Sequence, residues 1–204
     1  MKITTYLPLF FLLLTHVVFA AQKESSDVTH KNYSLSTLTT EPAIGINPWP
    51  MSDLSLSNLL QWNIKRKLSL VAHTSYSYNN AFLRNFNHIK TNYNYSLRQI
   101  IGPGTTFYAK NSSHTFSLLA GIKYDTYKET LENPEFEAFS ASVNSIRPDA
   151  GLMYNLKIGN KKYFFSYRMY LPLYSFPFKS LDTFSIDGNM ANLSIEFGFG
   201  IRLK

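Results

Sequence analysis

The strongest constraint on the fold is a two-residue alternation of apolar and polar positions at the C-terminal end of the sequence. From Ala191 to Leu203 every odd-numbered residue is apolar, and the residues between them are polar or glycine. Successive side chains of a β-strand point to opposite faces, so this period predicts a strand with one apolar and one polar face. A helix would need a period of 3.6 residues, which this stretch does not follow.

The same alternation recurs along most of the chain. The clear runs number eight and lie at about 53–63, 67–79, 88–98, 101–110, 114–126, 148–158, 162–174 and 189–203. Two further stretches, Tyr33–Thr40 and Phe136–Val143, alternate less well and would raise the number to ten. Because helical periodicity is absent beyond the first twenty residues, we predict an all-β fold.

Turn-forming residues divide these runs into short and long connections. Asn63–Lys67 and Gly159–Lys161 are short and polar, as in hairpins, and Leu97–Ile100 is interpreted as a third short hinge. The longer polar connections lie at 79–87, 128–144 and 175–189. We therefore expect antiparallel hairpins with short turns at one end and long loops at the other.

Strand length and aromatic placement separate a membrane barrel from a soluble sandwich. The runs are about 10–14 residues long, whereas strands of soluble proteins have about 5–6. Their apolar faces end in aromatic residues, where an outer-membrane barrel has its interfacial girdles. These residues are Trp62, Tyr76, Tyr78, Tyr124, Tyr163 and Tyr174. The pattern favours a transmembrane barrel, with a soluble secreted β-barrel or sandwich as the alternative.

The opposite faces of the runs combine small polar residues with charges of both signs. The charged residues are Lys90, Arg98, Lys123, Asp125, Arg168, Glu196 and Arg202. Such faces suit a narrow lumen filled with hydrogen-bonded pairs.

With these features, residues Trp49–Lys204 resemble small bacterial outer-membrane β-barrel proteins, and the Asn/Ser/Lys-rich, aromatic style is similar to that of Bacteroidetes-type bacteria. The resemblance implies an antiparallel up-and-down transmembrane β-barrel of about 8–10 strands. It also implies outer-membrane lipid, the outer-membrane insertion machinery and periplasmic chaperones as partners. In that class the last strand acts as an insertion signal with alternating hydrophobic residues. Phe197, Phe199, Ile201 and Leu203 match this alternation, whereas the terminal Lys204 departs from the usual aromatic residue.

The N-terminus predicts export from the cytoplasm. Lys2 precedes an apolar stretch, Leu7–Leu14, and Val18-Phe19-Ala20 resembles a cleavage site, so residues 1–20 are expected to be a signal peptide. No later stretch approaches 18 consecutive apolar residues, so no membrane-spanning helix is expected in the mature chain. The predicted location is the outer membrane of a Gram-negative bacterial cell.

The mature chain divides into two parts by composition. Residues 21–51 are rich in Ser and Thr and then in Pro, which predicts an extended lead-in or a plug in the lumen, with an added strand as the alternative. Residues 52–204 are expected to form the barrel.

No catalytic, cofactor-binding or metal-binding residue is predicted. The absence of cysteine excludes disulfides and thiolate sites. His73, His88 and His114 would be the histidines of a serine-type hydrolase, but no nucleophile elbow or metal-binding spacing accompanies them. Glu129, Glu132, Glu135 and Glu137 are interpreted as a solvated acidic loop, and Gly102-Pro103-Gly104 as a turn or bulge.

The formal net charge of +7 does not indicate nucleic-acid binding, because Lys and Arg are scattered along the strands. Side chains fill the interior of a barrel of about eight strands. We therefore expect a non-catalytic integral outer-membrane protein that contributes to envelope structure, adhesion or binding of an external ligand by its loops. A small-solute channel or porin and an outer-membrane lipid-modifying enzyme are the alternatives, so enzymatic activity stays an open question.

Overall fold

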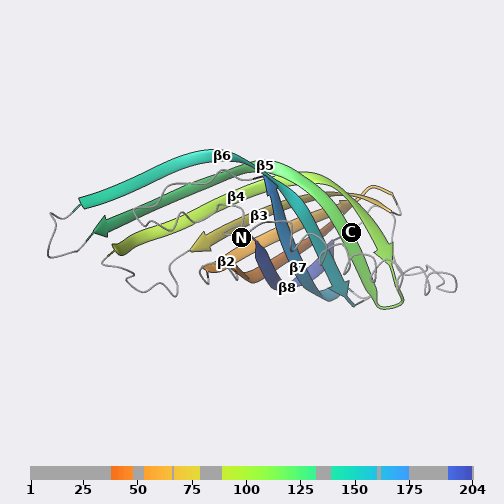
Figure 1. The fold of residues 1–204 in the computed structure, drawn as a ribbon. Coiled ribbons are helices and arrows are strands. Elements are labelled where there is room, and N and C mark those ends of the chain that lie inside the picture. The colour runs from red at the N-terminus through yellow and green to blue at the C-terminus, as the bar shows by residue number, and fades with distance from the viewer. Residues whose placement is uncertain are drawn as a thin grey trace, which may run out of the picture.

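The structure, a computed structural model, describes residues 38–47, 53–65, 67–78, 89–131, 139–159, 162–174 and 193–203, and these residues form one closed barrel of eight antiparallel strands (Figure 1). The strands are β1 (Leu38–Asn47), β2 (Asp53–Asn63), β3 (Leu68–Tyr78), β4 (Ile89–Tyr108), β5 (Ser112–Leu131), β6 (Phe139–Ile158), β7 (Tyr163–Tyr174) and β8 (Ser194–Leu203). Each strand pairs with its neighbours in sequence, and β8 closes the barrel on β1. The predicted antiparallel up-and-down barrel is confirmed.

The alternation of the last strand divides its side chains between outside and inside as predicted. Phe197 and Phe199 are 50% and 72% exposed on the outer surface, whereas Glu196 is 1% exposed in the interior. The same division holds in β3, where residues alternate between buried and exposed along the strand. Along these two strands the two-residue period thus places most polar side chains in the lumen and most apolar side chains outside.

The two ends of the barrel differ in their connections. Leu38 pairs with Leu203, so β1 begins at the end of the barrel where β8 finishes. Because all neighbouring strands are antiparallel, every even-numbered strand finishes at this end. The short connections that follow β2, β4 and β6 therefore lie here, at 64–67, 109–111 and 159–162. The connections at the other end are 48–52, 79–88, 132–138 and 175–193. The stretches Asn63–Lys67 and Gly159–Lys161 therefore fall at connections between paired neighbouring strands, as the sequence predicts.

The predicted hinge at Leu97–Ile100 is wrong, because 88–98 and 101–110 belong to the single strand β4 of 20 residues. Gly102-Pro103-Gly104, interpreted as a turn or bulge, also lies within this strand and pairs with β3. A Cβ atom on Gly102 would collide with the carbonyl oxygen of Leu118 on β5, so the glycine permits a close approach of two strands.

The start of the barrel also needs correction. Leu38–Asn47, expected within the lead-in or plug, is the barrel strand β1, so the barrel begins before residue 52. Glu41 on its inward face and Pro42, which has no N–H to donate, make the stretch unlike a strand in sequence. The Phe136–Val143 stretch is not a separate strand either, since β6 begins at Phe139 and continues to Ile158. The number of strands is therefore eight rather than ten.

The predicted signal peptide, residues 1–20, lies outside the described residues, as do 21–37 and 48–52. Export and a lead-in or plug N-terminal to β1 remain predictions. Within the described ranges, no helix is long and apolar enough to cross a membrane.

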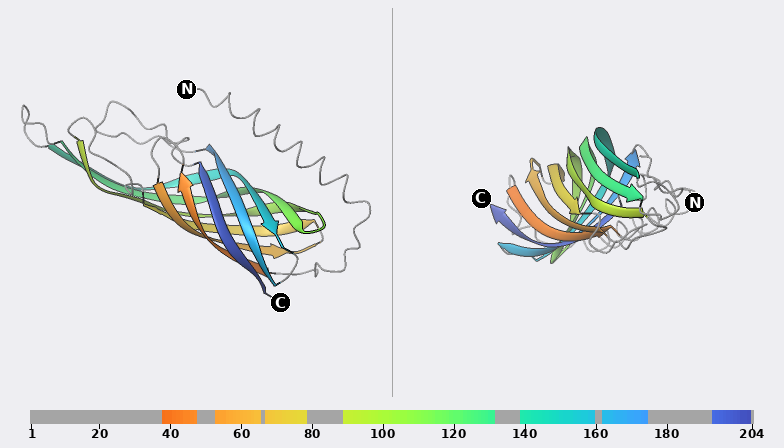
Figure 2. Two further views of the ribbon diagram at one scale, coloured as in Figure 1. Left: turned by 90° about the horizontal axis from the view of Figure 1, so that it is seen from below. Right: turned by 90° about the vertical axis from the view of Figure 1, so that its left-hand side faces the viewer.

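Strands β4, β5 and β6 extend beyond the other strands (Figures 1 and 2). Strand β5 pairs with β6 as far as Leu131 and Phe139. The pairing of β3 with β4 ends already at Tyr78 and Tyr95, and that of β7 with β6 ends at Tyr174 and Ala150. A three-stranded sheet therefore projects from the barrel at the end with the longer connections; we call it the projecting sheet.

Candidate functional site

The interior of the barrel gathers the buried polar and charged side chains. Two carboxylates, Glu41 and Glu196, each have less than 2% of their surface exposed and each accept several hydrogen bonds. Burying an ionised carboxylate is costly unless charged and hydrogen-bonding partners surround it. Each of the two carboxylates therefore lies at the centre of a network of polar and charged side chains in the lumen.

The first network surrounds Glu196 on β8. Arg168, directly opposite on β7, brings its Nε to 3.2 Å from Oε2, and Ser57 on β2 donates its hydroxyl to the same oxygen at 2.7 Å. His73 on β3 lies with Nε2 at 3.1 Å from Oε1. Four strands thus meet at one carboxylate, and the contacts of His73 and Ser57 cross the lumen.

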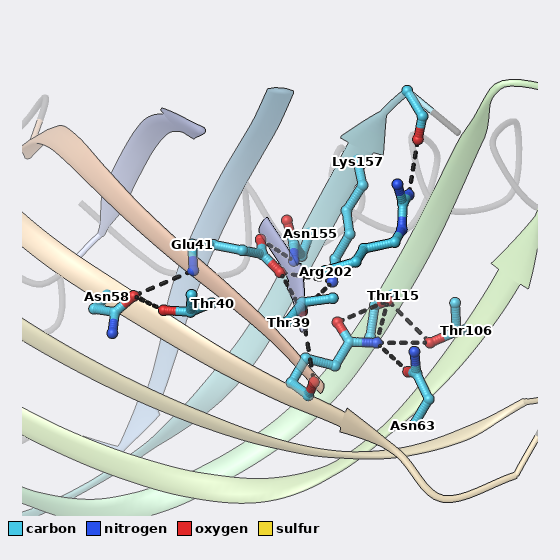
Figure 3. Close-up of polar contacts among 12 residues, drawn as sticks. Thr39, Thr40, Glu41, Asn58, Asn63, Thr106, Thr115, Asn155, Lys157 and Arg202 are labelled. Carbon is cyan, nitrogen blue, oxygen red and sulfur yellow. Dashed lines mark hydrogen bonds and ion pairs between the residues drawn. The ribbon is translucent and has the colours of Figure 1, made fainter. Parts of the chain in front are cut away.

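The second network surrounds Glu41 on β1 (Figure 3). Lys157 on β6 places Nζ at 2.6 Å from Oε1, and the Thr39 hydroxyl donates to the same oxygen at 3.0 Å. Asn155 donates its Nδ2 to Oε2 at 3.0 Å. Because β1 and β6 are not neighbours in the barrel, this network also connects opposite walls.

Additional polar contacts lie near the short turns. Gln61 Nε2 donates to Asn63, Thr106 and Thr115 at 2.8, 3.2 and 3.3 Å. Arg202 donates to the carbonyl oxygen of Gly159 at 2.8 Å (Figure 3). These bonds connect the strands at the end where both β1 begins and β8 finishes.

Nearer the projecting sheet, aspartate and aromatic contacts continue the packing. Asp149 accepts a hydrogen bond from Arg98 Nε at 2.6 Å and another from the Tyr170 hydroxyl at 3.0 Å. The Arg98 guanidinium lies 4.4 Å from the centre of the Tyr170 ring. A buried apolar cluster packs in the same interior; it consists of Leu59, Val71, Ile100, Leu119, Met153 and Tyr170.

These contacts show how the lumen is filled. A water-filled channel would leave the side chains on its wall exposed to solvent. Instead, the largest inward side chains, among them Arg168, Tyr170 and Met153, have less than 2% of their surface exposed. The described side chains therefore fill the barrel interior, as expected for eight strands.

The histidines considered as hydrolase candidates do not assemble into a triad among the described residues. His73 faces the lumen, but its Nε2 contacts Glu196, and the Ser57 hydroxyl donates to Glu196 rather than to the histidine. A Ser-His-acid triad needs the serine on the histidine and the acid on its other nitrogen. His114 lies on the outer face of β5, with Nδ1 at 2.9 Å from the Tyr154 hydroxyl, and His88 lies outside the described residues.

The acidic loop also gives no metal site that can be described. Residues 132–138, with Glu132, Glu135 and Glu137, lie outside the described residues. Among the residues that are described, no group of three or more His, Asp or Glu side chains could hold a metal ion.

Sequence reasoning missed Glu41 as a centre of the lumen. Its signal was the inward series Thr39, Glu41, Ala43 and Gly45, which is polar or small at every second position. The outward series is interrupted by Thr40 and Pro42, which hides the amphipathic pattern.

No protein-family model matches the chain, and no curated protein matches it either. Among solved structures, the chain is similar to Ail, the attachment invasion locus protein of Yersinia pestis, with 10% sequence identity, a TM-score of 0.45, and coverage of 82% of this chain and 95% of Ail. It is similar to the N-terminal β-barrel domain of Pseudomonas aeruginosa OprF, with 10% identity, a TM-score of 0.46, and coverage of 84% and 100%. For Neisserial surface protein A the identity is 10%, the TM-score 0.43, and the coverage 82% and 94%.

Proposed function

We propose that the chain is a non-catalytic integral protein of the bacterial outer membrane. The observation that carries the proposal is the apolar outer surface of the closed barrel. Its exposed side chains include Ile44, Leu56, Leu60, Leu70, Ile101, Leu118, Ile122, Ile158, Phe197 and Phe199. Soluble monomers rarely expose a continuous apolar surface of this extent, whereas lipid chains would cover it.

Aromatic residues near both ends of the barrel support the same environment. Trp62 and Tyr163 are exposed near the short turns, and Tyr76 and Tyr78 are exposed near the opposite end. Trp and Tyr prefer the interface between lipid chains and water, because they combine an apolar ring with a polar group. Closure of the barrel also satisfies the backbone N–H and C=O groups of the strands, which lipid could not do.

The projecting sheet is the part of the protein that we assign to the cell exterior. In outer-membrane barrels the short turns face the periplasm and the longer connections face outward. The projecting sheet lies at the end with the longer connections, where it offers a surface for adhesion or for an external ligand. The filled lumen argues against the channel alternative.

The cellular route belongs to the same proposal. Removal of a signal peptide at residues 1–20, transfer by periplasmic chaperones and insertion by the outer-membrane machinery would deliver the barrel to its location. A Gram-negative source of the Bacteroidetes type is likewise proposed from the style of the sequence.

The proposal is tested by expressing the full chain in a Gram-negative host. The protein should fractionate with the outer membrane, resist carbonate washing, and migrate differently on gels before and after boiling, because a folded barrel resists detergent. Recovery as a soluble periplasmic protein would contradict the proposal.

Planar-bilayer recordings test the filled lumen separately. The purified barrel should insert without producing a steady conductance above that of the bilayer. A steady, reproducible conductance would show that the lumen is open and would support the channel alternative.

A further inference from the structure

A row of polar side chains crosses the otherwise apolar outer surface. Asn58 on β2, Thr74 on β3 and Gln99 on β4 are exposed and lie directly opposite one another in successive strand pairs. Thr40 on β1 adjoins the row through its bond to Asn58. We call these four side chains the polar row.

Apolar residues border the polar row on both sides along the strands. Asn58 lies between Leu56 and Leu60, and Gln99 lies between Leu97 and Ile101. All four of these neighbours are exposed apolar residues. The polar row therefore lies within the apolar surface rather than at its border.

The barrel itself uses only part of the hydrogen-bonding capacity of the polar row. Asn58 Oδ1 accepts from the Thr40 hydroxyl at 3.1 Å and from the Glu41 N–H at 3.2 Å (Figure 3). The Asn58 Nδ2 donors are not used in these bonds. The side chains of Thr74 and Gln99 make no hydrogen bond to another described residue.

Such groups are unfavourable against lipid chains, which can neither donate nor accept a hydrogen bond. A partner surface with polar groups at the same depth would remove that cost. This step rests on the proposed function, because in water the polar row would simply be hydrated.

We propose that the polar row is the contact surface for a second copy of this chain in the membrane. An interface between identical copies needs a self-complementary surface. Asn58 supplies donors, and Gln99 and Thr74 supply both donors and acceptors, so two such rows can satisfy each other.

The symmetry of a membrane dimer fixes which strands meet. Two barrels with the same orientation are related by a two-fold axis along the membrane normal. An axis beside β3 places Thr74 next to Thr74 of the second copy and sets β2 of each barrel against β4 of the other. The small side chains of Ala72 and Thr74 on β3 allow the two walls to approach closely.

The wall formed by β7 and β8 lacks this combination of small and polar residues at its described outward positions. Its outer face carries clustered rings, with Phe197 at 5.3 Å from Tyr167 and 6.4 Å from Phe165 between ring centres. Lipid covers such a surface without loss, so the polar row selects the β2–β4 side for contact.

The chain has no native cysteine, so single cysteines report contacts directly. Thr74→Cys should form a disulfide-linked dimer in oxidised outer membranes. Phe197→Cys, on the far side at an equally outward position, is the matched control and should give about tenfold less dimer. Equal cross-linking of the two variants, or cross-linking of Thr74→Cys to a different protein, would overturn the proposal.

A second variant separates contact by hydrogen bonding from chance collision. Gln99→Leu in the Thr74→Cys background removes a polar contact on both sides of the axis and should lower dimer yield about eightfold. The Gln99 side chain makes no hydrogen bond to another described residue of its own barrel, so heat-dependent gel mobility should be retained. Unchanged cross-linking in a normally inserted variant would overturn the dimer, whereas loss of membrane fractionation in the parent chain would instead contradict the proposed function.

Discussion

At the scale of single residues, the lumen depends on a few buried charges with several partners each. The Glu196 carboxylate contacts the side chains of Arg168, His73 and Ser57, and all three are buried. Removing one member of such a network costs more than the bond itself, because the remaining charge stays buried without compensation.

We expect Glu196→Gln to lower the free energy of unfolding by about 3 kcal/mol, since Arg168 loses its buried counter-charge. Denaturant titration of the barrel refolded in lipid vesicles measures the change. Ser166→Ala is the control, because Ser166 is also buried but its hydroxyl has no hydrogen-bond partner among the described residues. Equal stability of Glu196→Gln and the parent chain would show that the network contributes nothing.

At the scale of strands, the facing of β8 decides which substitutions the membrane tolerates. Of the two outward phenylalanines of β8, Phe199 is the more exposed. The centre of its ring lies 5.8 Å from the centre of the Phe165 ring on β7. Its neighbours Gly198 and Gly200 face the interior.

Phe199→Arg should cost about 2–4 kcal/mol of folding free energy if the side chain lies near the middle of the bilayer. Phe199→Leu, which keeps the position apolar, should assemble almost normally. The fraction of heat-modifiable protein in outer membranes provides the measurement. Comparable assembly of the two variants would mean that Phe199 does not face lipid.

At the scale of the whole molecule, the barrel has one end with tight turns and one end with the projecting sheet. Lys65 is exposed in the turn between β2 and β3, and Ile146 is 70% exposed in the projecting sheet. The proposed orientation puts the first in the periplasm and the second outside the cell.

A membrane-impermeant thiol reagent should label Ile146→Cys on intact cells and leave Lys65→Cys unlabelled until the outer membrane is opened. The natural lack of cysteine removes background labelling from the chain. The reverse labelling pattern would invert the topology, and labelling of both variants on intact cells would contradict a membrane-spanning barrel.

Local alternation was enough to predict most of the strand segments, their facing and the two unlike ends, although it missed β1 and divided β4 into two runs. Phe197 outside, Glu196 inside and the turn at Gly159 all follow from short stretches of sequence. The physical reason is that successive side chains of a strand point to opposite faces, so consecutive residues in the sequence specify the two faces of the strand.

Closure of the barrel decided what alternation alone could not. Glu41 forms its ion pair with Lys157 only because β1 and β6 face each other across the lumen. Residues 38–47 therefore form a strand, although their sequence resembles that of a linker. Gly198 shows the same limit. The alternation places it on the polar inward face, where a serine would fit the pattern, yet a Cβ atom at this position would lie 2.3 Å from the Pro42 carbonyl oxygen. Such contacts join residues far apart in the chain, and their distances depend on the register and curvature of all the strands together, which no local pattern contains.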